Sequence, residues 1–185
     1  MLSQALVKSE EFSGELLDLV SSWQGRFNIR KAQKRDNKSI KELIQRILIQ
    51  QGGVGVDSLY YDDELVDIHD HYSKEGRIFL VLTYSRQVVG AIGLAPYEGG
   101  CFGDTPSCEI KKLYLRKDFR KMGRGKVLLD KAMKQAKKFG YKYVITKTER
   151  RNESFMEFLL RENFDLKECS FSTEDEPRLS FYREL

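Results

Sequence analysis

The sequence predicts a single α/β domain whose extended and helical segments follow one another in the order β-α-α-β-β-β-α-β-α-β-β. Two features carry this prediction. Residues 78–84 and 88–94 are apolar runs separated by a short polar turn, a pattern typical of a β-hairpin. Residues 109–115 form an extended run that leads through a glycine-containing loop into an amphipathic helix ending before Gly140. A chain of 185 residues is long enough to bury one sizeable core.

The other segments complete this order along the chain. Residues 1–25 carry apolar side chains at helical spacing and are predicted to be an N-terminal helical extension. A helix is predicted over 38–51, with Asp36 or Asn37 as its candidate N-cap. The remaining predicted elements are strands at 27–30, 141–146, 164–171 and 179–184 and a helix at 152–161.

The composition is that of a globular protein, and we expect a cytoplasmic one. Apolar residues make up 41% and charged residues 32% of the chain, and no run is long and apolar enough to span a membrane. The N-terminus lacks a basic start followed by an apolar core, so no secretory signal is predicted. The cysteines, Cys101, Cys108 and Cys169, have no metal-site spacing and are expected to be reduced thiols.

The loop after residues 109–115 is predicted to hold a phosphate or pyrophosphate group. A helix start presents unpaired backbone N–H groups and a partial positive charge. Gly123 and Gly125 have no Cβ, so an anion can come close to the backbone there. The basic side chains around the same turn are Arg120, Lys121, Arg124 and Lys126. The apolar face of the following helix is predicted to comprise Val127, Leu128, Ala132, Ala136 and Phe139.

The spacing of this loop is R-x-x-G-x-G, from Arg120 to Gly125, which resembles the acyl-CoA signature of the GNAT superfamily of N-acetyltransferases. It fits neither G-x-x-x-x-G-K-[ST] nor G-x-G-x-x-G. The resemblance implies that acetyl-CoA is the acyl donor and that backbone N–H groups hold its pyrophosphate; the alternative is an ordinary solvated basic loop. The implied cofactor contacts are Leu113, Tyr114, Leu115, Arg120, Lys121, Met122, Gly123, Arg124, Gly125, Lys126, Asn152 and Phe158.

The resemblance covers residues 26–185 and implies a mixed, mostly antiparallel central sheet of about six to seven strands flanked by helices. The family often shows an Asn, an aromatic-Tyr pair and a Gly-Phe pair, and these places hold Asn152, Phe158-Leu159 and Asn163-Phe164 here. Asn163 can stand for Gly because Asn also accepts a left-handed backbone. Leu159 is a departure, because the family's Tyr commonly protonates the departing CoA thiolate.

Glu109 is the predicted general base. An acceptor amine like that of lysine has an ordinary pKa of roughly 10.4, so it must lose a proton before it attacks the thioester. Many GNAT enzymes place a base here on this strand, and Cys108 to Tyr114 resembles one subset of them. An ordinary ion pair of Glu109 with Lys111 is the alternative. A backbone N–H near Tyr114–Leu115 would polarise the thioester oxygen, and transfer would be direct rather than through an acyl-cysteine.

The acceptor is expected to be a primary amine of a small molecule or peptide. The stretch 57–70 is acidic and contains Tyr60 and Tyr61, and in GNAT folds this segment usually borders the acceptor groove. An acidic, aromatic wall would favour a cationic amine, while an ordinary solvated helix face is the alternative. His69 and His71 do not have the orientation of paired metal ligands on a helix, so no metal is expected.

Two other functions stay open. A CoA-binding protein without catalysis, suggested by Leu159, would bind CoA but transfer no acetyl group. A basic nucleic-acid-binding module would show salt-dependent affinity that CoA does not displace. Net charge is only +4 and no groove-reading motif is present, so the phosphates of CoA account better for the basic region. We expect the N-terminal extension to pack either on the domain or on a partner subunit, and packing on a partner subunit would make the protein a homodimer.

Overall fold

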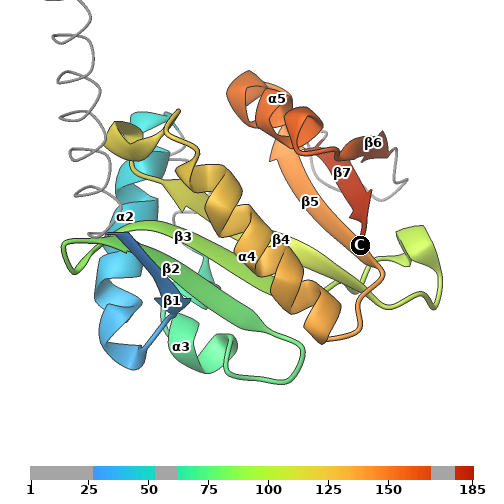
Figure 1. The fold of residues 1–185 in the computed structure, drawn as a ribbon, viewed down its shortest axis with the longest axis horizontal. Helices are drawn as coiled ribbons and strands as arrows, with labels where there is room; N and C mark the ends of the chain where they lie inside the picture. Colours follow the sequence, from blue (N-terminus) through green and yellow to red (C-terminus); the bar gives the residue numbers. More distant parts are fainter. Residues whose placement is uncertain (1–26, 53–61, 168–177) are drawn as a thin grey trace, which may run out of the picture.

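The computed structural model describes residues 27–52, 62–167 and 178–185, which form an α/β fold around one sheet (Figure 1). Its strands are β1 (Phe27–Lys31), β2 (Ile78–Tyr84), β3 (Gln87–Pro96), β4 (Ser107–Leu115), β5 (Tyr143–Glu149), β6 (Asp165–Lys167) and β7 (Arg178–Glu184). They lie in the order β1-β2-β3-β4-β5-β7-β6. Every neighbouring pair is antiparallel except β4 with β5. The predicted mixed, mostly antiparallel sheet is confirmed.

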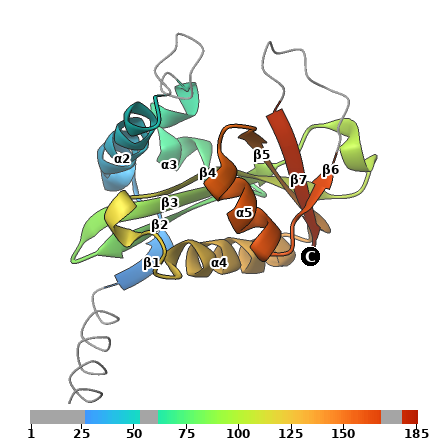
Figure 2. The same cartoon turned by 90° about the horizontal axis from the view of Figure 1, so that it is seen from above.

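Helices cover both faces of this sheet. They are α2 (Asn37–Gln50), α3 (Ile68–His71), α4 (Arg124–Lys138) and α5 (Glu153–Arg161), with short 3-10 turns η1 (Lys34–Asp36), η3 (Asp63–Leu65), η4 (Gly100–Phe102) and η5 (Lys117–Phe119). Figure 2 shows α2 and α3 on one side of the sheet and α4 on the other. The α5 helix shares the α4 side, because its buried Leu159 belongs to the same core cluster as the α4 side chains.

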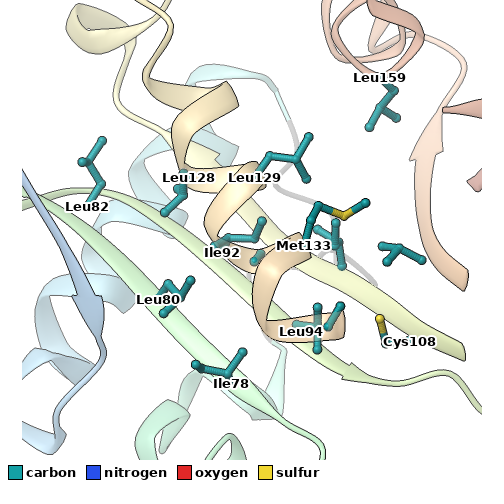
Figure 3. Packing of buried hydrophobic residues seen from close by; sticks show 14 of the residues in the cluster. Ile78, Leu80, Leu82, Ile92, Leu94, Cys108, Leu128, Leu129, Met133 and Leu159 are labelled. Carbon is teal, nitrogen blue, oxygen red and sulfur yellow. The ribbon is translucent and has the colours of Figure 1, made fainter. Parts of the chain in front are cut away.

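The core consists of two clusters of buried side chains, one on each face of the sheet. Successive residues of β2 alternate between them, so both faces of this strand are apolar. The cluster on the α4 side includes Leu80, Leu82, Ile92, Leu94, Leu128, Leu129 and Met133 (Figure 3). The cluster on the α2 side includes Ile40, Ile44, Ile47, Phe79, Val81 and Ala91. The hairpin between β2 and β3 turns at Ser85 and Arg86, both with positive φ, as two-residue hairpin turns require.

The buried face of α4 differs from the prediction at two positions. Val127 and Phe139 are 50% and 41% exposed. The buried residues are Leu128, Leu129, Ala132, Met133 and Ala136. Successive residues are about 100° apart around a helix, so Leu129 and Met133 lie beside Leu128 and Ala132 and widen the buried face on that side. Val127 lies on the opposite side of Leu128 and faces solvent. The predicted stop is confirmed, since Gly140 has φ +83° directly after the helix.

Asp36, one of the two predicted caps, is the N-cap residue of α2, but its side chain makes no capping hydrogen bond. The Asp36 carboxylate accepts two hydrogen bonds from the Arg30 guanidinium, at 2.6 and 2.9 Å, and one from the Gln33 N–H at 2.8 Å. The Asn37 Oδ1 accepts a hydrogen bond from the His69 N–H. The Asp36 side chain therefore binds a charged partner, and the Asn37 side chain binds a distant segment, instead of the first N–H groups of α2.

The expectation of reduced thiols is wrong for Cys101, which is disulfide-bonded. Cys108 is free and buried. Sequence spacing could not predict this bond, because disulfide formation depends on Cα distances within the fold. The argument for a cytoplasmic location from reduced thiols therefore fails at Cys101.

Some predictions concern residues that the structure does not describe. These are the extension over 1–25, much of the glycine-rich turn and acidic stretch within 53–61, and the second half of the strand predicted over 164–171, whose first half contains β6. Among the described helices, none is long and apolar enough to cross a membrane.

The α4 packing gives a stability prediction. Leu128→Ala removes a side chain with no exposed surface and should lower the free energy of unfolding by about 2–5 kcal/mol. Val127→Ala is the matched control at the neighbouring, half-exposed position and should cost no more than about 0.5 kcal/mol. Urea unfolding of both variants measures the difference. Equal losses would contradict the placement of the helix face.

Candidate active site

The candidate site begins where β4 and β5 separate. The two parallel strands pair only from Ser107 to Glu109 on β4 and from Tyr143 to Ile145 on β5. The Thr146 hydroxyl then donates a hydrogen bond to the Ile110 carbonyl at 3.2 Å, and beyond it the strands diverge (Figure 1). The edge of β4 after Ile110 therefore faces an opening in the sheet, where a ligand could use its backbone groups.

A β-bulge lies in β4 directly along this opening. Ala91 pairs with Tyr114 and Gly93 with Lys111, so Lys112 and Leu113 together oppose Ile92. Lys112 has φ +56°, which is uncommon for a residue other than Gly, Asn or Asp. The extra residue lets Leu113 return to the α4-side cluster that Ile110 also faces. Backbone groups at the bulge are thereby released from regular pairing beside the opening.

The N-terminus of α4 follows β4 after a loop, residues 116–123, that contains η5. Gly123 is the N-cap with φ +70°, and a Cβ built on it would meet no atom within 4 Å. The first bond inside the helix runs from the Val127 N–H to the Gly123 carbonyl at 3.1 Å. The N–H groups of the three preceding residues, 124–126, thus have no intrahelical acceptor, and the helix dipole adds positive potential. These N–H groups lie where the sequence predicts the anion seat, that is, the binding place of a phosphate or pyrophosphate.

Most of the basic side chains around this turn have partners within the protein. The Arg120 Nε donates to the Leu115 carbonyl at 2.8 Å, which ties the loop to the end of β4. The Arg124 guanidinium lies 4.1 Å from the centre of the Phe27 ring, a cation–π contact on the first strand. Lys121 adopts φ +60° in the turn and, like Met122, is exposed. Backbone groups rather than side chains are therefore the donors best placed at the seat.

Lys126 connects the seat to α5. Its ammonium lies 2.6 Å from a Glu162 carboxylate oxygen and 3.6 Å from Asp130. Phe158 of α5 lies above Gly125, with its ring 3.7 Å from the place of a glycine Cβ. These contacts place Phe158 and Lys126 beside the seat, but the Lys126 charge is already neutralised. A ligand phosphate here would compete with Glu162 for that ammonium.

The second predicted motif lies at the start and the inner face of α5. Asn152 is the N-cap of α5, but its side chain makes no capping hydrogen bond, so its amide is not used to start the helix. Asn163 has φ +59°, as expected where the family has Gly. Leu159 is fully buried and points toward α4 in Figure 3. At the position where the family resemblance implies a tyrosine general acid, this chain therefore has the buried core side chain of Leu159.

Glu109 lies at the base of the opening. It pairs with Ala95 on β3 and Ile145 on β5, and since Ala95 belongs to the α2-side cluster, the Glu109 side chain points to that face. It is half-buried. No ion pair of Glu109 occurs in the described chain, because the Lys111 ammonium instead lies 2.9 Å from Glu64. The ordinary ion-pair alternative for Glu109 is therefore wrong.

Two of the described carboxylates in the acidic stretch predicted on the acceptor side are paired with lysines. Asp62 pairs with Lys112, and Glu64 pairs with both Lys111 and Lys112. Tyr60 and Tyr61 lie outside the described residues. The Tyr97 phenol lies near Glu109, and its pKa is raised by burial and by the charge of Glu109. The charges of Asp62 and Glu64 are therefore already compensated within the protein, while Asp63 and Asp70 are exposed and in no ion pair among the described residues.

Glu64 is the centre of a polar cluster that the sequence did not predict. It accepts hydrogen bonds from Lys111 and Tyr72, both at 2.9 Å, and lies 3.5 Å from His71. Burial alone would raise the pKa of Glu64, but the Lys111 hydrogen bond and the Lys112 charge lower it to about 2. Its stabilising contribution is therefore present above pH about 4.5 and is lost as the pH falls toward 2.

The sequence carries one signal that could have revealed this cluster. Apolar residues of β4 fall at Cys108 and Ile110 and then at Leu113 and Leu115, so the alternation shifts by one position. Such a shift is typical of a bulge, and it leaves Lys112 where a core residue is otherwise expected.

Two further groups bear on the chemistry. Cys108 is fully buried, and burial raises the pKa of its thiol, so it is not placed to act as a nucleophile. The His71 Nε2 lies 2.6 Å from the Arg77 Nη1, so this ring nitrogen already has a partner within the protein. Among the described residues, no three His, Cys, Asp or Glu side chains gather as a metal site would require.

Comparisons with known proteins agree with this geometry. The sequence model described as "Acetyltransferase (GNAT) family" matches residues 39–164. The Escherichia coli (strain K12) protein YjgM, described as an uncharacterized N-acetyltransferase, is 31% identical over 116 residues, which are 62% of this chain and 67% of that protein.

Solved structures match the fold at lower sequence identity. A GNAT-family acetyltransferase from Staphylococcus aureus has a TM-score of 0.71 and 22% identity over 85% of this chain and 98% of its own. The PaiA N-acetyltransferase from Thermoplasma acidophilum, in complex with coenzyme A, has a TM-score of 0.65 and 18% identity over 86% and 99%. On the fold, the strand opening and the family match together, this chain belongs to the GNAT family of acetyltransferases.

Proposed function

We propose that this acetyltransferase moves the acetyl group of acetyl-CoA directly onto a primary amine of a small molecule or peptide. The observation that carries the proposal is the position of Glu109, a carboxylate without an ion pair among the described residues, at the base of the strand opening. The opening runs along β4 from Ile110 to Leu115, about 16 Å at the usual rise per residue, and Glu109 lies at its base.

The cofactor would use both ends of this opening. Its pyrophosphate would accept hydrogen bonds from the free N–H groups at the start of α4, with Phe158 and Gly125 beside it. Its pantetheine arm would add along the unpaired edge of β4, near Leu113, and reach Asn152 at the start of α5. The complex of PaiA with coenzyme A supports the choice of ligand.

Glu109 would take the proton from the incoming amine. Its side chain faces the α2 side, while the α4 seat and Leu159 lie toward the other cluster, so the acceptor and the cofactor would approach from opposite faces of the sheet. The nitrogen then attacks the thioester carbon, and the C–S bond breaks to release CoA. Buried Cys108 supports direct attack over an acyl-cysteine intermediate.

The thioester oxygen would be stabilised by a backbone N–H at the bulge. Leu113 is the best candidate, since the register leaves it unpaired with β3. The Tyr114–Leu115 region that the sequence favoured follows it directly on β4. The thiolate would leave without a phenol acid, because Leu159 is buried, and a thiol with an ordinary pKa of roughly 8.5 is a tolerable leaving group.

Incubating the protein with acetyl-CoA and a panel of amines while following free thiol tests the reaction. Thiol release that depends on an amine, with an acetylated product by mass spectrometry, is the expected result. CoA binding without transfer to any amine would instead favour a CoA-binding protein without catalysis.

The anion seat gives the first functional prediction. Gly125→Glu places bulk and negative charge at the first turn of α4, so CoA affinity by calorimetry should fall at least about a hundredfold, about 2.7 kcal/mol. Gln135→Glu makes the same charge change near the other end of the helix and should keep CoA affinity. Unchanged affinity in folded Gly125→Glu would refute this seat.

The Glu109→Gln variant gives the second functional prediction. The change keeps the shape and removes the proton acceptor, so turnover at neutral pH should fall at least about tenfold while CoA affinity holds. The loss should shrink at high pH, where the amine arrives already neutral. Glu75→Gln, at an exposed carboxylate, is the control. A turnover–pH profile equal to wild type would remove Glu109 from the mechanism.

A further inference from the structure

We propose that Asp62 and Glu64 of the η3 segment are positioning residues for acetyl transfer, because they anchor the β4 bulge through the buried ammonium of Lys112. This inference rests on the proposed function, since the bulge is where the thioester oxygen would be bound. It assigns a role to a segment that supplies no group to the reacting atoms.

The first step is the conformation of Lys112. It is the bulge residue with φ +56°, and nothing in its side chain favours a left-handed backbone, as the amide of Asn does. Such a conformation persists only where the surroundings hold it. The hydrogen bonds between β3 and β4 do not hold this conformation, because Lys112 and Leu113 share one opposing residue on β3. The restraint must come from the side chain.

The second step is the burial of that side chain. The Lys112 side chain is only 6% exposed, and its ammonium contacts the Asp62 carboxylate and lies 3.4 Å from Glu64. A buried ammonium is unfavourable unless it is paired and hydrogen-bonded. Any return of Lys112 to a regular β conformation would turn its side chain to the other face of the strand and leave both carboxylates without it. The ion pair therefore favours the bulged register.

The third step is that the same cluster holds the opposing strand. Tyr72 is fully buried and donates a hydrogen bond to Glu64 at 2.9 Å. Its hydroxyl lies 2.7 Å from where a Cβ of Gly93 would be, so its ring is packed directly on the β3 backbone. Gly93 is the β3 residue that pairs with Lys111, next to the bulge. Glu64 thus links Lys112 on β4 to a side chain that fixes β3 beneath it.

The consequence for the reaction is geometric. An oxyanion donor is effective only if its N–H is held toward the developing charge before reaction. Weakening the Lys112 anchor should let the bulge sample other registers, and the Leu113 N–H would lose its direction. Acetyl-CoA would still bind, because its pyrophosphate would be held at the start of α4, on a different element from the bulge. Turnover should therefore fall without a matching loss of cofactor affinity.

Lys112→Met tests this with steady-state kinetics. We expect kcat to fall at least about tenfold while KM for acetyl-CoA stays within about threefold, and Lys112→Arg to recover part of the loss because it restores the charge. Arg30→Met is the matched control, since it breaks another partly buried ion pair, with Asp36, far from the bulge. It should lower stability with kcat unchanged. A Lys112→Met kcat within about twofold of wild type would overturn the proposal, as would equal kcat losses in both variants.

Asp62→Asn provides a milder variant if Lys112→Met does not fold. Lys112 and Asp62 form one ion pair, so the kcat loss of the double variant Lys112→Met/Asp62→Asn should be smaller than the sum of the two single losses. Amide hydrogen exchange over residues 108–115 supplies a readout that needs no acceptor, and it should rise in Asp62→Asn but not in Arg30→Met. Additive kcat losses or unchanged exchange would overturn the anchor. A wild-type protein that acetylates no amine would sink the proposed function, and the exchange comparison would then decide the anchor alone.

Discussion

The divergence of β4 from β5 is the constraint on which the rest of the site depends. β4 must pair with β3 along nearly its whole length, yet it pairs with β5 only as far as Glu109. The backbone edge that this leaves open cannot stay unsatisfied at low cost, so it is either solvated or bound to a ligand. The bulge, the turn before α4 and the start of α5 all lie around this one opening, which is why they can act on a single molecule.

The electrostatics of the site depend more on backbone than on charged side chains. Arg120, Arg124 and Lys126 look like phosphate ligands in the sequence, but they bind a carbonyl, an aromatic ring and a carboxylate. They shape the turn and fix it to β1, β4 and α5. In the proposed site, the free N–H groups at residues 124–126 would supply the directed donors, and the helix dipole would supply the positive potential. On the opposite face, Lys111 and Lys112 neutralise carboxylates, so Glu109 keeps no paired cation among the described residues.

Local patterns predicted the fold well, because hairpin turns, helix periods and glycine stops are decided over short stretches. The β2–β3 hairpin and the stop at Gly140 are confirmed. Long-range partners could not be predicted: the Asp36 side chain binds Arg30 instead of capping α2, and Cys101 forms a disulfide. The Glu64 cluster was missed for the same reason, since its members come from η3, α3 and β4. Only the shifted alternation of β4, with Lys112 between Ile110 and Leu113, indicated it in the sequence.

A crystal structure of the protein with acetyl-CoA tests the central claim most directly. We predict pyrophosphate oxygens at hydrogen-bonding distance, about 2.7–3.2 Å, from backbone nitrogens of residues 124–126. The pantetheine arm should lie along β4 between its bulge and β5, with the thioester near Leu113 and within reach of an amine beside Glu109. A cofactor bound outside the β4–β5 opening, or a thioester on the far side of α4 from Glu109, would contradict the account.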